Sequence, residues 1–259
     1  MSYDRDGEII VWSDFTGFVN DHVWGTGTLV GDLANGIGFT SDDEGSFAQT
    51  IDEPGGILAI TTDVGDDDSA VLFAGPFFAR DGETEMKARF KYSNVDCAIM
   101  VGFQETISAT APVMGLEFAT ATMTYGNVGN VAGMNYDVDG TTDDFRAAMG
   151  DAQAALLDSS NGIRANATVT ADRWLEAVVK VHNDGGAEMW LSDIGHVDAD
   201  SIPNLRLIKH FRRTPGGAAG LTTTDPIFAM LMIENRSANA RVLEVDYFGA
   251  KGYRDRRPT

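Results

Sequence analysis

The clearest pattern of apolar and polar positions runs from Glu83 to Tyr92, where apolar and charged side chains alternate almost perfectly. A period of two predicts a strand with one face on a core and the other in water. Ser93-Asn94 favours a turn, and Asp96–Phe103 returns as a second, mostly apolar strand. A strand whose charged side chains point to solvent, followed by a more buried strand, is typical of two stacked antiparallel sheets.

The same alternation recurs in Trp174–Val181. The following Asn183-Asp184-Gly185-Gly186 predicts a hairpin turn, because Asn, Asp and Gly tolerate positive φ. Ala187–Ser192 is therefore expected to pair back onto the preceding strand. Other strands are predicted at Glu8–Phe15, Ile57–Thr62, Ser69–Phe73, Pro226–Glu234 and Arg241–Tyr253.

One segment departs from the strand pattern. Phe145–Asp158 is rich in Ala and has helix propensity, but Gly150 interrupts it, so a short helix and two strands are both open there. No internal repeat or long linker divides the 259 residues. We therefore predict a single domain over 1–259, an all-β antiparallel sandwich with at most one short helix. Residues 1–7 and 253–259 are predicted to be arms that are flexible or ordered by a partner.

Charge and composition exclude several classes of protein. The formal net charge is −20, so we expect no nucleic-acid partner, because neutralising phosphates requires clustered cations. No apolar run approaches the roughly 20 residues of a membrane span. The polar start MSYDRDGE does not resemble a secretory signal, so folding in a cytoplasm is expected. The single cysteine, Cys97, lies in an apolar strand, which predicts a buried, reduced thiol.

An acidic turn is the main candidate for a metal site. Asp137, Asp139, Asp143 and Asp144 surround Gly140, and closely spaced carboxylates can hold Ca²⁺. The alternate acids and terminal Glu of a helix–loop–helix calcium loop are missing. A solvated acidic turn is therefore the preferred interpretation, with Ca²⁺ as the alternative.

The four histidines are scattered along the chain, at His22, His182, His196 and His210. None of them shows the His-x-His or His-x-x-x-His spacing that brings two imidazoles together on one element. The sequence therefore predicts no zinc or transition-metal site, and no cofactor.

Two basic clusters stand out against the acidic background. We expect these residues to dock on acidic neighbouring subunits. The alternative is that the first cluster belongs to a surface on which the charges are balanced, and that the second is a frayed C-terminus. The residues concerned are Arg206, Lys209, Arg212, Arg213, Arg254, Arg256 and Arg257, with His210 and Lys251 beside them.

Trp174 and Trp190 fall on the face opposite the apolar series of their strands. The hairpin would bring them near each other, so they are predicted to form either a subunit interface or a sugar-stacking platform. The interface is preferred, because no polar sugar-binding triplet accompanies the pair.

Several segments follow one another along the chain: VWSDF, EMKARFKY followed by CAIMVGFQET, DRWLEAVVKVHNDGGAEMWLSD, and VLEVDYFGAKG. Their order resembles the concanavalin A-like (laminin-G-like, jelly-roll) proteins found among tailed-phage structural proteins, and the resemblance extends roughly from Glu8 to Gly252. The resemblance implies a concanavalin A-like antiparallel β-sandwich. It further implies a non-enzymatic virion protein that decorates or cements a phage capsid.

The same resemblance implies partners and a location. The partners would be the major capsid protein or other virion subunits, the chain would form a symmetric homo-oligomer, and it would be located in the virion. The alternative is a lectin-like carbohydrate-binding module, on a virion or free, which would bind a glycan.

A glycoside hydrolase is the least favoured alternative. The fold also hosts β-glucanases, whose catalytic strand reads Glu-x-Asp-x-x-Glu, and this chain has Glu244 and Asp246 but Gly249 in the third acidic position. A two-carboxylate mechanism then lacks its second partner. The sequence therefore predicts no catalytic residues.

Overall fold

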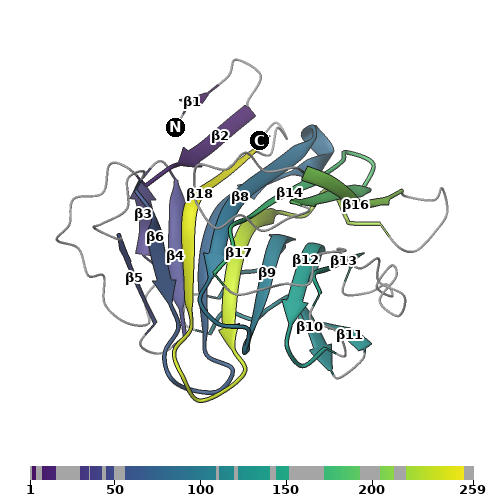
Figure 1. The fold of residues 1–259 in the computed structure, drawn as a ribbon. Coiled ribbons are helices and arrows are strands. Elements are labelled where there is room, and N and C mark those ends of the chain that lie inside the picture. Colours follow the sequence, from purple (N-terminus) through teal and green to yellow (C-terminus); the bar gives the residue numbers. More distant parts are fainter. Residues whose placement is uncertain are drawn as a thin grey trace.

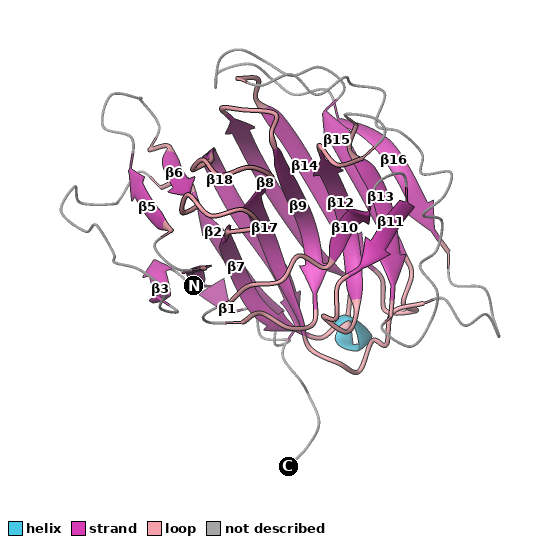
Figure 2. Cartoon of the chain, turned by 90° about the horizontal axis from the view of Figure 1, so that it is seen from below, coloured by secondary structure: helices cyan, strands magenta, loops and turns pink. Residues whose placement is uncertain are grey.

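A computed structural model places the chain in two antiparallel sheets that pack face to face (Figure 1). It describes residues 2–3, 8–15, 30–34, 36–42, 45–49, 56–108, 111–119, 122–140, 144–151, 172–192, 205–212 and 220–253. The predicted all-β antiparallel sandwich is confirmed. Within these ranges the helical element is one 3₁₀ turn, η1 (Ala79–Asp81), cyan in Figure 2. None of their helical segments has the length and hydrophobicity to cross a membrane.

Sheet A has nine strands. The main path runs β1 (Ser2–Tyr3), β2 (Glu8–Ser13), β18 (Val242–Tyr253), β8 (Thr84–Tyr92), β14 (Leu175–Val181), β15 (Ala187–Ser192) and β16 (Leu205–Phe211). Two further strands, β5 (Ser46–Gln49) and β6 (Leu58–Thr61), extend the sheet beside the first half of β18.

Sheet B has seven strands. Their order is β13 (Arg146–Gly150), β12 (Val131–Asp137), β9 (Cys97–Gln104), β17 (Ile227–Asn235), β7 (Ser69–Phe77), β4 (Ile37–Ser41) and β3 (Val30–Ala34). A separate hairpin of β10 (Leu116–Ala119) and β11 (Thr122–Tyr125) completes the described strands.

The two strands that define the sequence pattern lie in different sheets. β8 pairs with β14 and β18 in sheet A, whereas β9 pairs with β12 and β17 in sheet B. The chain therefore crosses the sandwich between Tyr92 and Cys97. This crossing is the physical reason for the change from alternating to continuous apolar sequence, since the two strands face different surroundings.

The main core fills the space between the two sheets. An aromatic chain joins them there: Phe90 of sheet A contacts Phe145, Phe145 contacts Tyr136 of sheet B, and Tyr136 stacks on Tyr92. A second apolar cluster covers the other face of sheet B. In it, Met100 and Met232 pack with Leu116 and Met123 of the β10–β11 hairpin. Both faces of sheet B are therefore covered by apolar clusters, whereas the outer face of sheet A, within the described residues, carries mostly polar and charged side chains.

Two expectations from the sequence need correction and one is confirmed. Arg146–Gly150 is strand β13, so the helix alternative is wrong there, and residues 152–158 lie outside the described part. Tyr253 ends strand β18 and accepts a hydrogen bond from the Phe78 backbone, and Ser2–Tyr3 pair with β2 as β1, so these residues do not belong to the predicted arms. The hairpin of β14 and β15 is confirmed, with Val181 opposite Ala187.

Cys97 is expected to resist thiol reagents in the folded protein. Its side chain is fully buried, and this burial raises the pKa of the thiol to about 12. Because the thiolate is the reactive form, almost none is present near neutral pH. Titration with an aromatic disulfide reagent should label no thiol in native protein and one per chain in guanidinium chloride. Labelling of native protein within minutes would contradict this prediction.

Candidate functional site

The outer face of sheet A carries many of the charged side chains of the described chain. Alternation in β8 places Glu85 and Lys87 on this face, while Met86 and Ala88 enter the core between the sheets. Lys87 Nζ lies 2.6 Å from Glu176 Oε1 on β14. Such cross-strand pairs balance the charges of neighbouring strands and fix their register.

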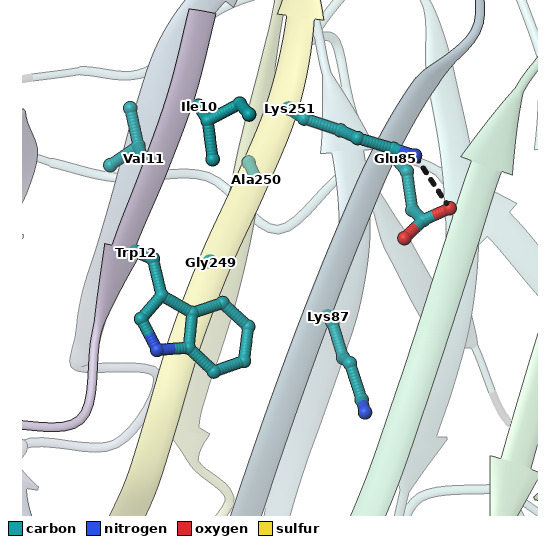
Figure 3. A pocket seen from close by; sticks show the side chains of 8 residues that line it. All are labelled: Ile10, Val11, Trp12, Glu85, Lys87, Gly249, Ala250 and Lys251. Atoms are coloured by element: carbon teal, nitrogen blue, oxygen red, sulfur yellow. Dashed lines mark ion pairs between the residues drawn. The ribbon is translucent and has the colours of Figure 1, made fainter. Parts of the chain in front are cut away.

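A hollow opens on this face where β2, β18 and β8 run side by side (Figure 3). Trp12 is its main apolar element, and 45% of the Trp12 surface is exposed. Glu85 and Lys251 form an ion pair at the other side, with Nζ and Oε2 3.5 Å apart. The lining residues are Ile10, Val11, Trp12, Glu85, Lys87, Gly249, Ala250 and Lys251.

Gly249 makes room for the indole of Trp12. A Cβ at position 249 would lie 2.2 Å from the Trp12 ring, so any larger residue would displace it. The ring also stacks on Tyr247 of β18, with centroids 4.9 Å apart. Trp12 is therefore held over β18, as Figure 3 shows, and is a fixed platform rather than a freely moving side chain.

The Tyr247 hydroxyl stays protonated beneath this platform. Burial raises its pKa, and a hydrogen bond to Glu176 raises it further. Lys87 lies over the Tyr247 ring, with Nζ 5.3 Å from the centroid, which is a cation–π contact. The hollow thus combines one exposed aromatic surface with fixed donors and acceptors around it.

The sequence pattern contains a signal for this hollow. In β2 the inward positions are Ile9 and Val11, yet the outward positions Ile10 and Trp12 are also large and apolar. It is unusual for a strand with only one buried face to carry two large apolar side chains on its other, solvent-facing side. The prediction from the sequence placed the sugar-stacking platform, as the less favoured alternative, at Trp174 and Trp190 instead.

The structure does not pair those other two tryptophans. Trp190 lies opposite Val178, and Trp174 is four residues away along β14, about 13 Å at strand spacing. Trp174 is only 3% exposed, and Arg89 and Lys91 lie over its ring. Trp190 is half-buried under Lys180. Trp174 and Trp190 therefore do not form an exposed pair.

The basic residues predicted as partner contacts are only partly described. Lys209 lies over the Phe211 ring, with Nζ 5.4 Å from the centroid, and Arg212 is exposed at the end of β16. Arg206 is placed as a backbone position on β16. Arg213, Arg254, Arg256 and Arg257 fall outside the described ranges, so their predicted contacts stay predictions.

Asp137, the first acid of the predicted solvated turn, is not solvated. Asp137 is buried and binds Arg236 with both carboxylate oxygens, at 3.1 Å to Nε and 2.9 Å to Nη2. The Phe118 backbone also donates to it, at 3.0 Å. Arg236 thus supplies the positive charge that Ca²⁺ would supply in the alternative, while Asp139 stays at the surface. Asp143 lies outside the described part.

The two acids of the closing strand are bound in ion pairs. Glu244 Oε2 lies 2.6 Å from Lys91 Nζ, and Asp246 Oδ2 lies 3.7 Å from Arg89 Nε. The third position, Gly249, is covered by the Trp12 ring. Among these three positions there is thus no pair of facing carboxylates for glycoside hydrolysis.

Two histidines that are distant in sequence meet on sheet A. His182 follows β14 and His210 lies on β16, and their ring centroids are 5.9 Å apart. Glu188 of β15 lies between them, and the three side chains can offer ligand atoms within 4.8 Å of one another. Their spacing in the sequence gave no sign of this cluster.

No family model and no curated protein sequence matches the chain. Solved structures do match, among them peanut lectin with a 9mer peptide, at a TM-score of 0.58 and 9% identity, over 94% of this chain and 97% of that one. A protein of unknown function from Shewanella oneidensis MR-1 matches at a TM-score of 0.56 and 13% identity, over 100% and 92%. The potassium-bound carbohydrate recognition domain of Emp46p matches at a TM-score of 0.51 and 6% identity, over 96% of this chain and 98% of that one.

These similarities establish the fold. The chain has the concanavalin A-like β-sandwich, as the sequence resemblance implied. At such low identity they show the architecture alone, so the virion role stays a prediction.

Proposed function

We propose that this concanavalin A-like β-sandwich is a non-enzymatic, lectin-like carbohydrate-binding module, and that the sugar binds in the hollow around Trp12. The observation that carries the proposal is the Trp12 indole, fixed over β18 yet 45% exposed. The likeness to peanut lectin and to a carbohydrate recognition domain supports the same class of function.

The hollow fits the two kinds of surface that a sugar ring presents. An indole face offers an apolar, electron-rich surface to the C–H groups of the ring. Glu85, Lys87 and Lys251 border the indole and can accept from or donate to hydroxyl groups. Their existing ion pairs keep them in place, so binding would require little further ordering of side chains.

The same hollow lacks the groups for hydrolysis. Retaining and inverting glycosidases both use two carboxyl groups that flank the scissile bond. Among the eight lining residues, Glu85 is the one carboxylate, and it is bound to Lys251 and Lys180. The proposal is therefore binding without turnover.

Trp12→Ala is expected to weaken glycan binding at least tenfold. A glycan array would first identify a ligand for the unmodified protein, and calorimetry with that ligand would then give the affinities. The expected loss corresponds to about 1.4 kcal/mol or more, as for removal of a central aromatic contact. Far-UV circular dichroism would show that the variant keeps its fold.

The matched control is Leu207→Ala. Leu207 is 52% exposed on β16, also in sheet A but away from the hollow, so its removal should leave the affinity unchanged. Equal binding by Trp12→Ala and the unmodified protein would reject the hollow as the site. A protein that binds no glycan on the array would reject the function.

A virion structural protein that decorates or cements a capsid is the second candidate. Ile10 and Trp12 are 43% and 45% exposed side by side on the outward face of β2, and such an exposed apolar pair favours contacts with other subunits. In this role the chain would form homo-oligomers on the major capsid protein of a virion, and the contacts between subunits would cover both side chains. Light scattering should then show an oligomer that Ile10→Asp dissociates, and a monomer would argue against this role.

A further inference from the structure

A cluster of metal-binding side chains crosses three adjacent strands of sheet A, away from the Trp12 hollow. His182 directly follows β14, Glu188 lies on β15 and His210 on β16, where Glu188 and His210 are direct cross-strand partners. Their neighbours Val181, Ala187 and Phe211 all enter the core between the sheets. Because side chains alternate along a strand, the three metal-binding groups share the outer face.

We propose that His182, Glu188 and His210 bind one divalent transition-metal ion, with Zn²⁺ as the best-suited ion. The spacing of the ligand atoms is the first support. His210 Nδ1 lies 3.4 Å from Glu188 Oε1, and His182 Nε2 lies 3.7 Å from the same oxygen. These distances exceed a normal hydrogen bond. They match the edge of a coordination tetrahedron, which is about 3.4 Å for metal–ligand bonds of about 2.1 Å.

The state of the His182 ring is the second support. Its Nε2 is a buried atom that makes no hydrogen bond within the described part of the chain. Its other nitrogen, Nδ1, lies 3.4 Å from Glu83 Oε2. A ligating histidine characteristically directs its second nitrogen to a carboxylate, which orients the ring and raises its basicity. Glu83 faces this nitrogen slightly beyond normal hydrogen-bond length, so a small shift of its side chain would give it this role.

The local charges also suit a cation. Glu83, Glu85 and Glu188 face this part of the sheet, and Lys180 is bound by the first two, at 3.4 Å and 3.1 Å. The Lys180 charge is thus compensated, and Glu188 remains for the metal. The sheet backbone holds the ligands, because His182 donates its N–H to Gly186 at the hairpin turn, at 2.9 Å.

The donor set selects the kind of ion. Two imidazoles and one carboxylate suit Zn²⁺, Cu²⁺ or Ni²⁺, whereas Ca²⁺ and Mg²⁺ prefer all-oxygen sites. Three protein ligands leave the fourth position of a zinc tetrahedron for water or an outside ligand. His182 is half-buried and His210 partly exposed, so an ion can reach the cluster from solvent.

Calorimetric titration with zinc chloride tests the site, on protein made without a polyhistidine tag. The unmodified protein should bind one Zn²⁺ per chain, and zinc should raise its melting temperature. The double variant His182→Gln/His210→Gln should bind at least tenfold more weakly and lose this stabilisation. Without zinc, the melting temperatures of the two proteins should agree, since both side chains lie on the surface of the sheet. Cobalt should give the visible absorption of a tetrahedral ion only in the unmodified protein.

Two single variants separate ligation from general charge. Glu188→Gln and Glu244→Gln remove the same charge from the same sheet, but only the first removes a ligand. Zinc affinity should fall at least tenfold in Glu188→Gln and stay unchanged in Glu244→Gln. Equal losses in both, a loss below tenfold in the double variant, or no zinc binding by the unmodified protein would overturn the proposal. Glycan binding at Trp12 is a separate readout that none of these results would change.

Discussion

Arg236→Met should cost about 3–5 kcal/mol of the free energy of unfolding, the range for breaking a buried ion pair. The Arg236 guanidinium is largely buried and binds Asp137 through two nitrogens. It also contacts Glu234 and, at 2.9 Å, Asp67. Met keeps much of the side-chain volume but leaves the carboxylates of Asp137 and Glu234 buried without a counter-charge. Burying such charges unpaired is the source of the expected loss.

The loss should shrink as the pH falls. Burial raises the pKa of Glu234 from 4.5 to about 8, although Arg236 pulls it down. The folded state therefore binds the Glu234 proton more tightly than the unfolded state does. Ionisation of Glu234 thus lowers stability progressively as the pH rises from about 4.5 to about 8. Without Arg236 this penalty grows. The free energy of unfolding of the variant should therefore come closest to that of the unmodified protein at the acidic end of this pH range.

Urea denaturation at about pH 8 and about pH 5 would measure both effects. Lys91→Met is the matched control, because it breaks the Lys91–Glu244 pair on the surface of sheet A. Both side chains of this pair keep contact with solvent, so its loss should cost no more than about 1 kcal/mol, with little pH dependence. If Arg236→Met were as mild as Lys91→Met, the buried network would contribute nothing special to stability.

Phe145→Ala should cost a similar amount, about 3–5 kcal/mol. Phe145 is fully buried and precedes β13. Its ring lies 6.1 Å from that of Phe90 in sheet A and 5.7 Å from that of Tyr136 in sheet B. Removing the ring leaves a cavity between the two sheets, which the strands on either side can close only partly.

Phe145→Leu provides the comparison for this site. It keeps most of the apolar volume and should cost about 1.5 kcal/mol or less. Guanidinium denaturation, followed by tryptophan fluorescence, would give both free energies if the slopes of the transitions agree. An alanine variant no less stable than the leucine variant would mean that the aromatic chain does not link the sheets.

The local hydrophobic pattern predicts much of the fold. The alternation in β8 and in β14 follows from one dry and one wet face, and both strands are where the pattern places them. The continuous apolar run of β9 fits a strand with apolar clusters on both faces. The pattern left Arg146–Gly150 undecided between a short helix and strands, because its composition is Ala-rich. Pairing with β12 overrides that weak propensity and makes the segment a strand.

The sites depend on contacts that no local pattern records. The sequence presents Asp137 as one acid of a polar turn, and only the fold brings Arg236 to it across sheet B. It presents Trp12 as one of four tryptophans, and only the pairing of β2 with β18 sets it over Gly249. His182 and His210 are distant in the chain and meet because β14, β15 and β16 are neighbours.

The sequence by itself therefore determined the class of fold, the position of most strands and which of their faces are apolar. These follow from the two-residue period, because each strand has to match its own surroundings. Only the tertiary structure decided which sheet each strand joins and which polar side chains meet. Those contacts depend on the order and register of strands that are far apart in the chain, and strand pairing sets both.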